Sequence, residues 1–567
     1  MADMKGKSRE EIIQQDIRDL HKLGYAQQLF REMGGFSNFA ISFSIISILT
    51  GAILLYGFGL RFAGPVINTV GWPLVSIFVM IIAASMAELA SAYPTAGGLY
   101  FWAHKLGGHR WAWVTAWFNM IGQITITSGI NIAAAIYIVG AVTRIFAIPG
   151  DTTVPVFGSL TNWYFYVFIM VLIMIPQILI NAFGIKLTAR LNDISVYWHI
   201  GGVIIIALLL TIFGKTHNPL SFAFQFVNTT NPYDFASAEL ADGTVGPALY
   251  LGNPITLEPL FVLPSPLFAV LPFLTDLYKA APFLLVFAIG LLQAQWTYTG
   301  YDASAHVAEE TVLARLNSAW GVFLSVAVSA VVGYIVLMAL TLAITDIPST
   351  ATDAYPVLKV AYDNLNTFMA NLVAIIIAGA MWLCGLSSIT SMSRMWFAFA
   401  RDGGMPGHGL IKQIHPKWRT PVNSILITCA LAVIMLLWSG AYYVVTAISV
   451  IFLYWAYGIP ILLNLRNKQR KQGEYTTPET APWSLKQWGP LLNIISVIWI
   501  LLITVFLVIP PNELVLWTTV LICVFMLIYW QVDVKKRFAG PTKADEEELR
   551  KIEADMAAAA HGKAGDD

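Results

Sequence analysis

The stretch WTYTGYDASAHVAEE, residues 296–310, follows the apolar run FLLVFAIGLL at residues 283–292. A chain entering hydrocarbon here places a glycine, an aspartate, a histidine and two glutamates on its path. On insertion scales, a charged side chain at the bilayer centre costs about 2.5–3.5 kcal/mol. Such residues persist only where they face a cavity or a partner. The stretch therefore predicts a membrane span that lines a polar pathway.

The composition of the 567-residue chain is that of a membrane protein. Hydrophobic residues make up 57% and charged residues 12%, with a mean hydropathy of +0.68. Soluble domains carry roughly 25% charged residues, so we expect a lipid bilayer to solvate much of this surface. The formal net charge of zero argues against nucleic acid as a partner. The polar N-terminus shows no cleavable signal peptide, so the first apolar segment is expected to remain as a span.

Apolar runs of about 20 residues, the length a helix needs to cross a bilayer, predict an all-α membrane protein with twelve transmembrane helices. They fall at roughly 38–60, 66–92, 112–146, 163–184, 194–214, 282–308, 318–345, 368–398, 422–438, 443–464, 489–509 and 513–532. The third is long enough to tilt strongly. Its Asn, Gln, Thr and Gly residues predict contact with protein or water on one face.

The predicted organisation is one membrane domain, at residues 37–535, between an N-terminal segment at 1–36 and a charged tail at 536–567. A long outer loop is expected at about 215–281. Part of it, from Pro254 to Pro282, is apolar but repeatedly interrupted by proline. Unpaired backbone is expensive in hydrocarbon, so we interpret this part as loop, with an additional span as the alternative.

The distribution of basic residues predicts the orientation in the membrane. With both termini in the cytoplasm, nearly all of the 33 Lys and Arg residues fall in cytoplasmic segments. The exceptions on the outer side are Arg61, Arg144, Lys215, Lys279 and Lys359. This is the bias that the positive-inside rule describes, so we expect a multi-pass protein of the cell membrane with both termini cytoplasmic.

Two spans carry residues that a plain lipid-facing helix does not need. Span one has Thr50 and Gly51 at its middle, and span six has TYTGYD, residues 297–302, at a comparable depth. These positions lie five spans apart, as expected for a five-plus-five inverted repeat whose first helices are discontinuous. Unwound helices offer N–H groups to an anion and carbonyl groups to a cation. The alternative for each glycine is close helix packing.

Four stretches together resemble amino acid permeases of the amino acid–polyamine–organocation superfamily. They are AELASAYPTAGGLYFWA at 87–103, WTYTGYDASAHVAEET at 296–311, SRMWFAFARDGGMP at 393–406 and HPKWRTPVNS at 415–424. The segment LGYAQQLFREMGGFSNFAISFSIISILTG, residues 23–51, is similar to the amino acid/choline transporter branch. The resemblance covers about residues 20–535 and implies secondary active transport on the five-plus-five fold.

The resemblance also implies a set of substrate-binding residues. Ile48, Leu49, Thr50 and Gly51 correspond to the turn that holds a substrate carboxylate. The family pattern has a glycine where this chain has Leu49, so Thr50 and Gly51 are the expected N–H donors. In span six, the residues that match the stretch whose carbonyls hold an ammonium are Trp296, Tyr298, Thr299, Gly300 and Tyr301. The aromatic faces of Trp296 or Tyr301 could serve the same cation.

Several acidic residues have two interpretations. Asp302 is expected to begin the second half of span six, where its carboxylate could cap exposed N–H groups or contact the substrate. Glu309 and Glu310 should form a gate or an ion pair with inner cations. Glu88 is expected to anchor the YPTAGG turn at residues 93–98. For His306, we expect a packing or gating role.

The coupling ion is predicted to be H⁺, with Na⁺ as the alternative. The resemblance places His199 near the position on span five where proton-coupled relatives carry a lysine. Histidine titrates near neutral pH and can carry a proton. The alternative is a neutral His199 that only donates to a backbone carbonyl.

The predicted function is a symporter for a small amino acid or a 4-aminobutyrate-like zwitterion, working by alternating access. Choline or a polyamine is the alternative cationic substrate, and a sensor on the same fold that does not transport is a further alternative. No metal-ligand spacing, nucleophile elbow or phosphate-binding loop is visible, so we expect neither an enzyme nor a cofactor. The scattered cysteines Cys384, Cys429 and Cys523 are expected to be small buried hydrophobes.

Overall fold

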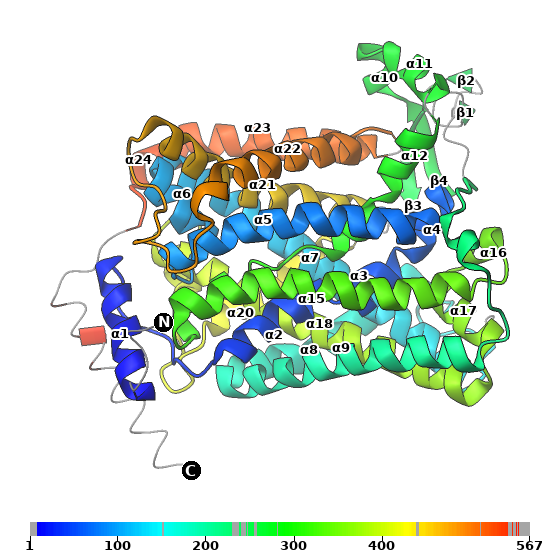
Figure 1. Ribbon diagram of the computed structural model, residues 1–567, viewed down its shortest axis with the longest axis horizontal. Coiled ribbons are helices and arrows are strands. Elements are labelled where there is room, and N and C mark those ends of the chain that lie inside the picture. Colours follow the sequence, from blue (N-terminus) through cyan, green and yellow to red (C-terminus); the bar gives the residue numbers. More distant parts are fainter. Residues whose placement is uncertain are drawn as a thin grey trace.

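The structure is a bundle of long helices that run side by side (Figure 1). This computed structural model describes residues 8–149, 152–229, 238–239, 245–246, 248–253, 258–280, 282–437, 441–510, 512–541, 547, 551–552 and 554. The helices α1 (Arg9–Lys22) and α24 (Lys535–Arg537) lie at one end of the bundle. The helices α16 (Ile347–Thr352) and α17 (Pro356–Asn364) lie at the other end.

The described chain supplies the twelve predicted spans. Ten helices are long and apolar enough to cross a membrane, and two shorter apolar helices complete the set. In chain order the spans are α2 (Gly35–Ile46) with α3 (Ile48–Leu54), α5 (Trp72–Ala92), α7 (His109–Ile145), α8 (Trp163–Phe183), α9 (Ile185–Phe213), α12 (Pro282–Gly290) with α13 (Leu292–Thr297), α15 (Ala314–Leu342), α18 (Thr367–Arg401), α20 (Val422–Ile434), α21 (Ala441–Arg470), α22 (Gly489–Val508) and α23 (Glu513–Tyr529). Span one and α7 have the largest share of buried residues, whereas α23 has the smallest, followed by α8 and α22.

Shorter helices connect the spans. They are α4 (Tyr56–Ala63), η2 (Ile67–Gly71), α6 (Leu99–Gly107), η3 (Leu220–Phe224), α14 (Ala303–His306), η5 (Ala308–Glu310), α19 (His408–Ile411), η6 (Lys486–Trp488) and η7 (Trp530–Val534). The helix α9 begins nine residues earlier than the predicted fifth span, because Gly184 ends α8 and the chain turns directly into the next helix. Polar residues at its start lie outside the apolar run used to predict it.

The predicted polar face of span three is confirmed. The helix α7 packs between α18 and α21. Asn119 and Gln123 donate to the Asp302 carboxylate, and Thr127 Oγ1 lies 2.6 Å from Ser388 Oγ. These contacts connect α7 to the discontinuous span six and to α18.

The loop predicted at 215–281 contains secondary structure of its own. Two antiparallel hairpins are formed by β1 (Ala238–Glu239) with β2 (Val245–Gly246), and by β3 (Ala248–Asn253) with β4 (Glu258–Pro264). Two short helices follow, α10 (Pro266–Val270) and α11 (Phe273–Ala280). None of these described elements is long enough to cross a bilayer.

Span one breaks at a different residue from the one predicted. The helix α2 ends at Ile46, Ser47 adopts a left-handed conformation with φ 32° and ψ 84°, and α3 begins at Ile48. The prediction of unwinding at Ile48–Gly51 is therefore wrong by a few residues. Gly51 instead allows close packing, since a Cβ there would lie 2.7 Å from the Cα of Thr297 on α13.

The predicted break in span six is confirmed. The helix α13 ends at Thr297 and α14 begins only at Ala303. Between them, Gly300 has φ +81°, a conformation that side chains disfavour. A Cβ at Gly300 would also lie 2.3 Å from Cγ2 of Ile45 on α2. Both the backbone angle and the close approach of α2 therefore require glycine at this position.

The N-terminal helix α1 docks on the start of span seven. The Asp16 carboxylate accepts hydrogen bonds from the backbone N–H groups of Leu313 and Ala314, at 2.6 and 3.2 Å. These groups belong to the first turn of α15, whose N–H donors have no partner within the helix. An acidic side chain from a distant helix thus caps α15 and holds α1 against the bundle.

Candidate functional site

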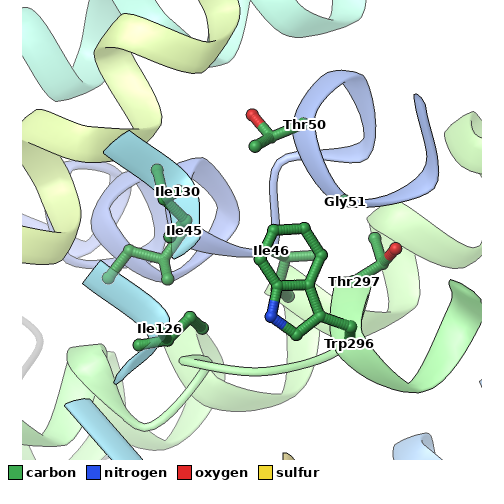
Figure 2. A pocket seen from close by; sticks show the side chains of 8 residues that line it. All are labelled: Ile45, Ile46, Thr50, Gly51, Ile126, Ile130, Trp296 and Thr297. Atoms are coloured by element: carbon green, nitrogen blue, oxygen red, sulfur yellow. The ribbon is translucent and has the colours of Figure 1, made fainter. Parts of the chain in front are cut away.

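A small cavity lies between the two discontinuous spans (Figure 2). It is lined by Ile45, Ile46, Thr50, Gly51, Ile126, Ile130, Trp296 and Thr297. Its volume is about 10 Å³, which is about the space that one water molecule needs. The lining combines apolar side chains with the polar backbone of two helix ends, as small-molecule sites do.

The indole ring of Trp296 lies across this cavity. Figure 2 shows the ring among the lining residues, with Thr50 and Gly51 above it and Ile126 and Ile130 to its left. A Cβ at Gly129 of α7 would lie 3.2 Å from the ring, so this glycine makes room for the indole. Trp296 Nε1 is buried and has no hydrogen-bond partner among the described residues. Movement of this ring would enlarge the cavity, and its N–H is available to a bound molecule.

The two N–H donors predicted in span one are already engaged. Thr50 N and Gly51 N both donate to the carbonyl oxygen of Ser47, at 2.8 and 3.0 Å. The prediction that they bind a carboxylate is therefore not supported by this geometry. Ile48 and Leu49 stand in the first turn of α3, and in the described part of the chain their N–H groups have no acceptor. They are the donors that the break exposes.

The side chain of Leu49 points away from the cavity. Leu49 Cδ1 would lie 3.3 Å from a Cβ at Gly202 of α9, and Ile376 Cγ2 would lie 2.5 Å from the same atom. Gly202 therefore makes room for the leucine that replaces the glycine of the family pattern.

The unwound part of span six is held by tyrosines of α21. Tyr454 Oη donates to the carbonyl of Tyr298 at 3.1 Å, and Gly300 N donates to Tyr457 Oη at 3.1 Å. Within the described ranges, no donor reaches the carbonyl oxygens of Thr297 and Thr299. These two carbonyls are the acceptors that the break exposes.

Two predicted aromatic residues do not line the cavity. Tyr298 Oη lies 2.6 Å from Ser76 Oγ, and its ring packs against Trp72. The ring of Tyr301 packs against Tyr457 with 4.9 Å between centroids. Both side chains therefore support the unwound stretch, and Trp296 is the predicted aromatic residue that faces the cavity.

Asp302 neither caps α14 nor reaches the cavity. The carboxylate makes no capping hydrogen bond to the helix that follows it. Its Oδ2 accepts from Asn119 and Gln123 at 2.9 and 3.1 Å, and its Oδ1 accepts from Tyr457 Oη at 2.9 Å. The predicted cap is therefore wrong, because partners from α7 and α21 hold the carboxylate.

Three side chains after the break connect span six to its neighbours at the α1 end. His306 Nε2 lies 3.0 Å from Asp302 Oδ2, and Nδ1 lies 3.1 Å from the carbonyl of Ala96. Two ion pairs to α18 follow, which are Glu309 with Arg401 and Glu310 with Arg394. Glu309, Glu310 and Arg394 are buried and Arg401 is 11% exposed, so the expected pairing with inner cations is present without contact with the cavity.

Glu88 anchors a different segment from the one predicted. Its Oε2 accepts from Lys468 Nζ at 2.7 Å and from Thr476 Oγ1 at 2.9 Å, and its Oε1 accepts from the backbone of Leu485 at 3.2 Å. It therefore holds the loop between spans ten and eleven. The YPTAGG turn is held instead by Glu309, whose Oε1 accepts from Ala96 N at 3.0 Å.

His199 contacts the residue at which span one breaks. Its Nε2 lies 2.7 Å from Ser47 Oγ, and its Nδ1 lies 2.8 Å from the carbonyl of Ser195. The ring is fully buried. Across the described ranges, no three His, Cys, Asp or Glu side chains converge as a metal site would require.

Sequence reasoning missed several residues of this site. Ser47 was overlooked because serine in an apolar helix gives no sign of a left-handed backbone. Asn119 and Gln123 carried a usable signal, since they lie four residues apart on the polar face of span three. Tyr457 lies in an apolar span and had no signal in one sequence.

The similarity to known proteins agrees with this geometry. The family model described as amino acid permease matches residues 33–531. The chain is 30% identical to the amino-acid permease BAT1 of Arabidopsis thaliana, covering 92% of this chain and 95% of that protein. It is 25% identical to the GABA-specific permease of Saccharomyces cerevisiae, covering 74% of this chain and 66% of that protein. The chain belongs to the amino acid permease family.

Proposed function

We propose that this permease is a secondary active transporter that moves a small neutral amino acid or a 4-aminobutyrate-like zwitterion by alternating access. The observation that carries the proposal is the pair of helix breaks across one cavity. Thr50 and Gly51 line it from span one, directly after the unpaired N–H groups of Ile48 and Leu49, and Trp296 and Thr297 line it from span six, directly before the break. Such a site offers opposite partial charges to the two ends of a zwitterion.

The electrostatics of the helix ends support this choice of substrate. The N-terminus of a helix favours a carboxylate through its N–H groups and its dipole. Unpaired carbonyls favour an ammonium, and the face of Trp296 adds cation–π attraction. The similarity to an amino-acid permease and to a GABA-specific permease supports a zwitterionic substrate. The cavity lining contains no carboxylate, which a polyamine would require.

The closed state of the cavity supports alternating access. At about 10 Å³ it is too small for an amino acid, so Trp296 or the half-helices must move for a substrate to enter. The Glu309–Arg401 and Glu310–Arg394 pairs close the path at the α1 end. We propose that these pairs open when the substrate leaves on that side.

We propose that the α1 end faces the cytoplasm. Arg61 donates to the carbonyl of Ala351, and the Arg144 guanidinium lies over the ring of Tyr355. These cations and Lys359 therefore gather near α16 and α17, the end that carries few basic residues. In this orientation, residues 1–36 and 536–567 flank the membrane domain at 37–535 on the cytoplasmic side.

Coupling to H⁺ through His199 is part of the proposal. The Ser195 carbonyl only accepts, so Nδ1 carries hydrogen and the neutral ring accepts from the Ser47 hydroxyl at Nε2. Ser47 Oγ also lies 2.6 Å from Thr50 Oγ1. If His199 takes up a proton, the Ser47 hydroxyl can turn toward Thr50 and accept from Nε2. A proton on His199 would thereby change the hydrogen bonds at the break of span one.

Transport assays on the purified protein in liposomes test this function. A panel of labelled neutral amino acids, 4-aminobutyrate, choline and a polyamine should show uptake of a zwitterion. A proton gradient directed into the liposomes should accelerate this uptake more than a sodium gradient does. Counterflow without any gradient should exchange that substrate. Binding without exchange would identify a sensor, and preferential uptake of choline or a polyamine would overturn the substrate assignment.

A further inference from the structure

The imidazole of His306 is fixed by an acceptor on each side. Nδ1 lies 3.1 Å from the carbonyl oxygen of Ala96, in the YPTAGG turn. A carbonyl oxygen only accepts, so Nδ1 must carry hydrogen. A Cβ at Gly98 of the same turn would lie 3.3 Å from the ring, so the turn also packs against it. The tautomer of a neutral His306 is thereby fixed, with its lone pair on Nε2.

That lone pair faces a carboxylate oxygen. Nε2 lies 3.0 Å from Oδ2 of Asp302, and both side chains are fully buried. If His306 were neutral and Asp302 ionised, a lone pair on Nε2 would face a lone pair on Oδ2 at this distance, with no hydrogen between them. Either Nε2 also carries hydrogen, which makes His306 an imidazolium, or Oδ2 carries it, which makes Asp302 a carboxylic acid. We infer that the Asp302–His306 pair binds one dissociable proton in this conformation.

The surroundings favour the pair with its proton. With the proton bound, the pair has no net charge. Without the proton, the pair would carry one negative charge in a site that is not exposed to water, and burying a single charge is costly. The other contacts of the carboxylate come from donors on Asn119, Gln123 and Tyr457. His199 differs, because the Nε2 atom of a neutral ring already accepts a hydrogen bond from the Ser47 hydroxyl. The geometry therefore requires the additional proton at the Asp302–His306 pair and does not require one at His199.

The other ionisable groups near α14 do not supply the hydrogen between Nε2 and Oδ2. On η5 and α18, Glu309 pairs with Arg401 and Glu310 pairs with Arg394. The helix α2 carries no ionisable side chain, and Arg315 at the start of α15 donates to the carbonyls of Ser91 and Thr480. On α21, the facing groups are the hydroxyls of Tyr454 and Tyr457, and Tyr301 adjoins the pair on span six.

The Asp302–His306 pair contacts three neighbouring segments at the closed end. His306 contacts the YPTAGG turn, and Asp302 accepts from Asn119 of α7 and from Tyr457 of α21. If α14 moved away from these partners, the Asp302–His306 pair would lose these hydrogen bonds and would release its proton. The consequence for transport rests on the proposed function: opening of the α1 end would release a proton together with the substrate. The presence of the proton itself does not rest on it.

Spectroscopy on the full-length protein in nanodiscs tests the proton directly. Nitrogen NMR of labelled histidine, with His306→Gln to assign the signal, reports which ring nitrogens carry hydrogen. Infrared spectra of wild type and Asp302→Asn report a protonated carboxyl. We expect either an imidazolium at His306 or a carboxylic acid band that Asp302→Asn removes. A neutral His306 at neutral pH, without such a band, would overturn the inference even if transport is normal.

Two variants extend the test. In Asp302→Asn the amide can donate to Nε2 without any additional proton, so His306 should become the neutral tautomer with hydrogen on Nδ1. His199→Gln is the matched control and should leave the His306 signal unchanged. In liposomes, the ratio of uptake with and without a pH gradient should fall toward unity in Asp302→Asn. If Asp302→Asn kept the wild-type ratio, this proton would be excluded from coupling. If wild type showed no counterflow at all, the proposed function would be refuted, but the inference about the proton would not.

Discussion

Ser47 Oγ lies 2.7 Å from Nε2 of His199, which connects the break in span one to an ionisable side chain on span five. Ser47 has the left-handed backbone that separates α2 from α3. Non-glycine residues adopt this conformation only where the surroundings hold them there. His199 and Thr50 supply that support through the Ser47 hydroxyl.

Replacement of His199 by alanine should weaken the pH dependence of transport. Wild-type uptake should rise on external acidification, because a proton on His199 would change the hydrogen bonds at Ser47. The variant should show a flatter profile, because the Ser47 hydroxyl loses the partner whose protonation redirects it. Initial uptake rates at a series of external pH values measure this. A profile that keeps its wild-type shape counts against a coupling role for His199.

Replacement of Gly300 by valine should abolish uptake while the protein still reaches the membrane. A side chain with φ near +81° is strained by about 1–2 kcal/mol, and its Cβ would also clash with Ile45. The unwound stretch must then move. Gly201→Val is the matched control, since a Cβ there meets nothing within 4 Å. Uptake at the wild-type rate in Gly300→Val would show that the unwound geometry is unnecessary.

The fold was largely predictable from the sequence because hydropathy and the paired glycines report membrane spans and a broken helix. The break at Gly300 was predictable since glycine, threonine and aspartate there have no use in a lipid-facing helix. The break in span one was misplaced because Gly51 suggested unwinding, whereas its missing side chain serves the contact with Thr297. A glycine alone does not distinguish these two uses.

The partners of the acidic residues were less predictable. Asp302, Glu88 and Glu309 could be recognised as buried or gating carboxylates, but their donors come from helices far away in the sequence. Their contacts depend on how spans three, eight and ten pack, which one sequence does not show. The ion pairing of Glu309 was expected. The sequence predicted that Glu88 anchors the YPTAGG turn, whereas Glu309 accepts the hydrogen bond from that turn.

Removal of one partner from the Glu309–Arg401 pair should destabilise the closed end. Both Arg401 amino nitrogens donate to the carboxylate at 3.0 Å, and Glu309 is fully buried. Breaking a buried pair typically costs about 3–5 kcal/mol, because the remaining charge loses its partner. Arg401→Ala should therefore lower Tm markedly in a thermal unfolding assay.

The control for this pair is Lys359→Ala, whose contact with Asp363 is partly exposed. Exposed pairs contribute at most about 1 kcal/mol, so its Tm should change little. The double reversal Glu309→Arg with Arg401→Glu should recover part of the lost stability. Equal Tm shifts for Arg401→Ala and Lys359→Ala would show that the buried pair does not hold this end closed.

Replacement of Asp16 by alanine should loosen α1 from the bundle. The carboxylate caps the first turn of α15, and loss of such a cap costs about 1 kcal/mol. Faster hydrogen exchange should appear in residues 9–22 and at the start of α15, while exchange in α18 stays unchanged. Asp19→Ala is the control, since its contacts stay within α1. Slow exchange retained throughout α1 in Asp16→Ala would show that other contacts hold the helix.

The most direct test of the account is a density map of the protein with a transported substrate bound. We predict a carboxylate at the N–H groups of Ile48 and Leu49, an ammonium at the carbonyls of Thr297 and Thr299, and a displaced Trp296 ring. Both helices should stay interrupted at Ser47 and Gly300. Continuous helices through these residues, or a substrate bound away from them, would contradict the account.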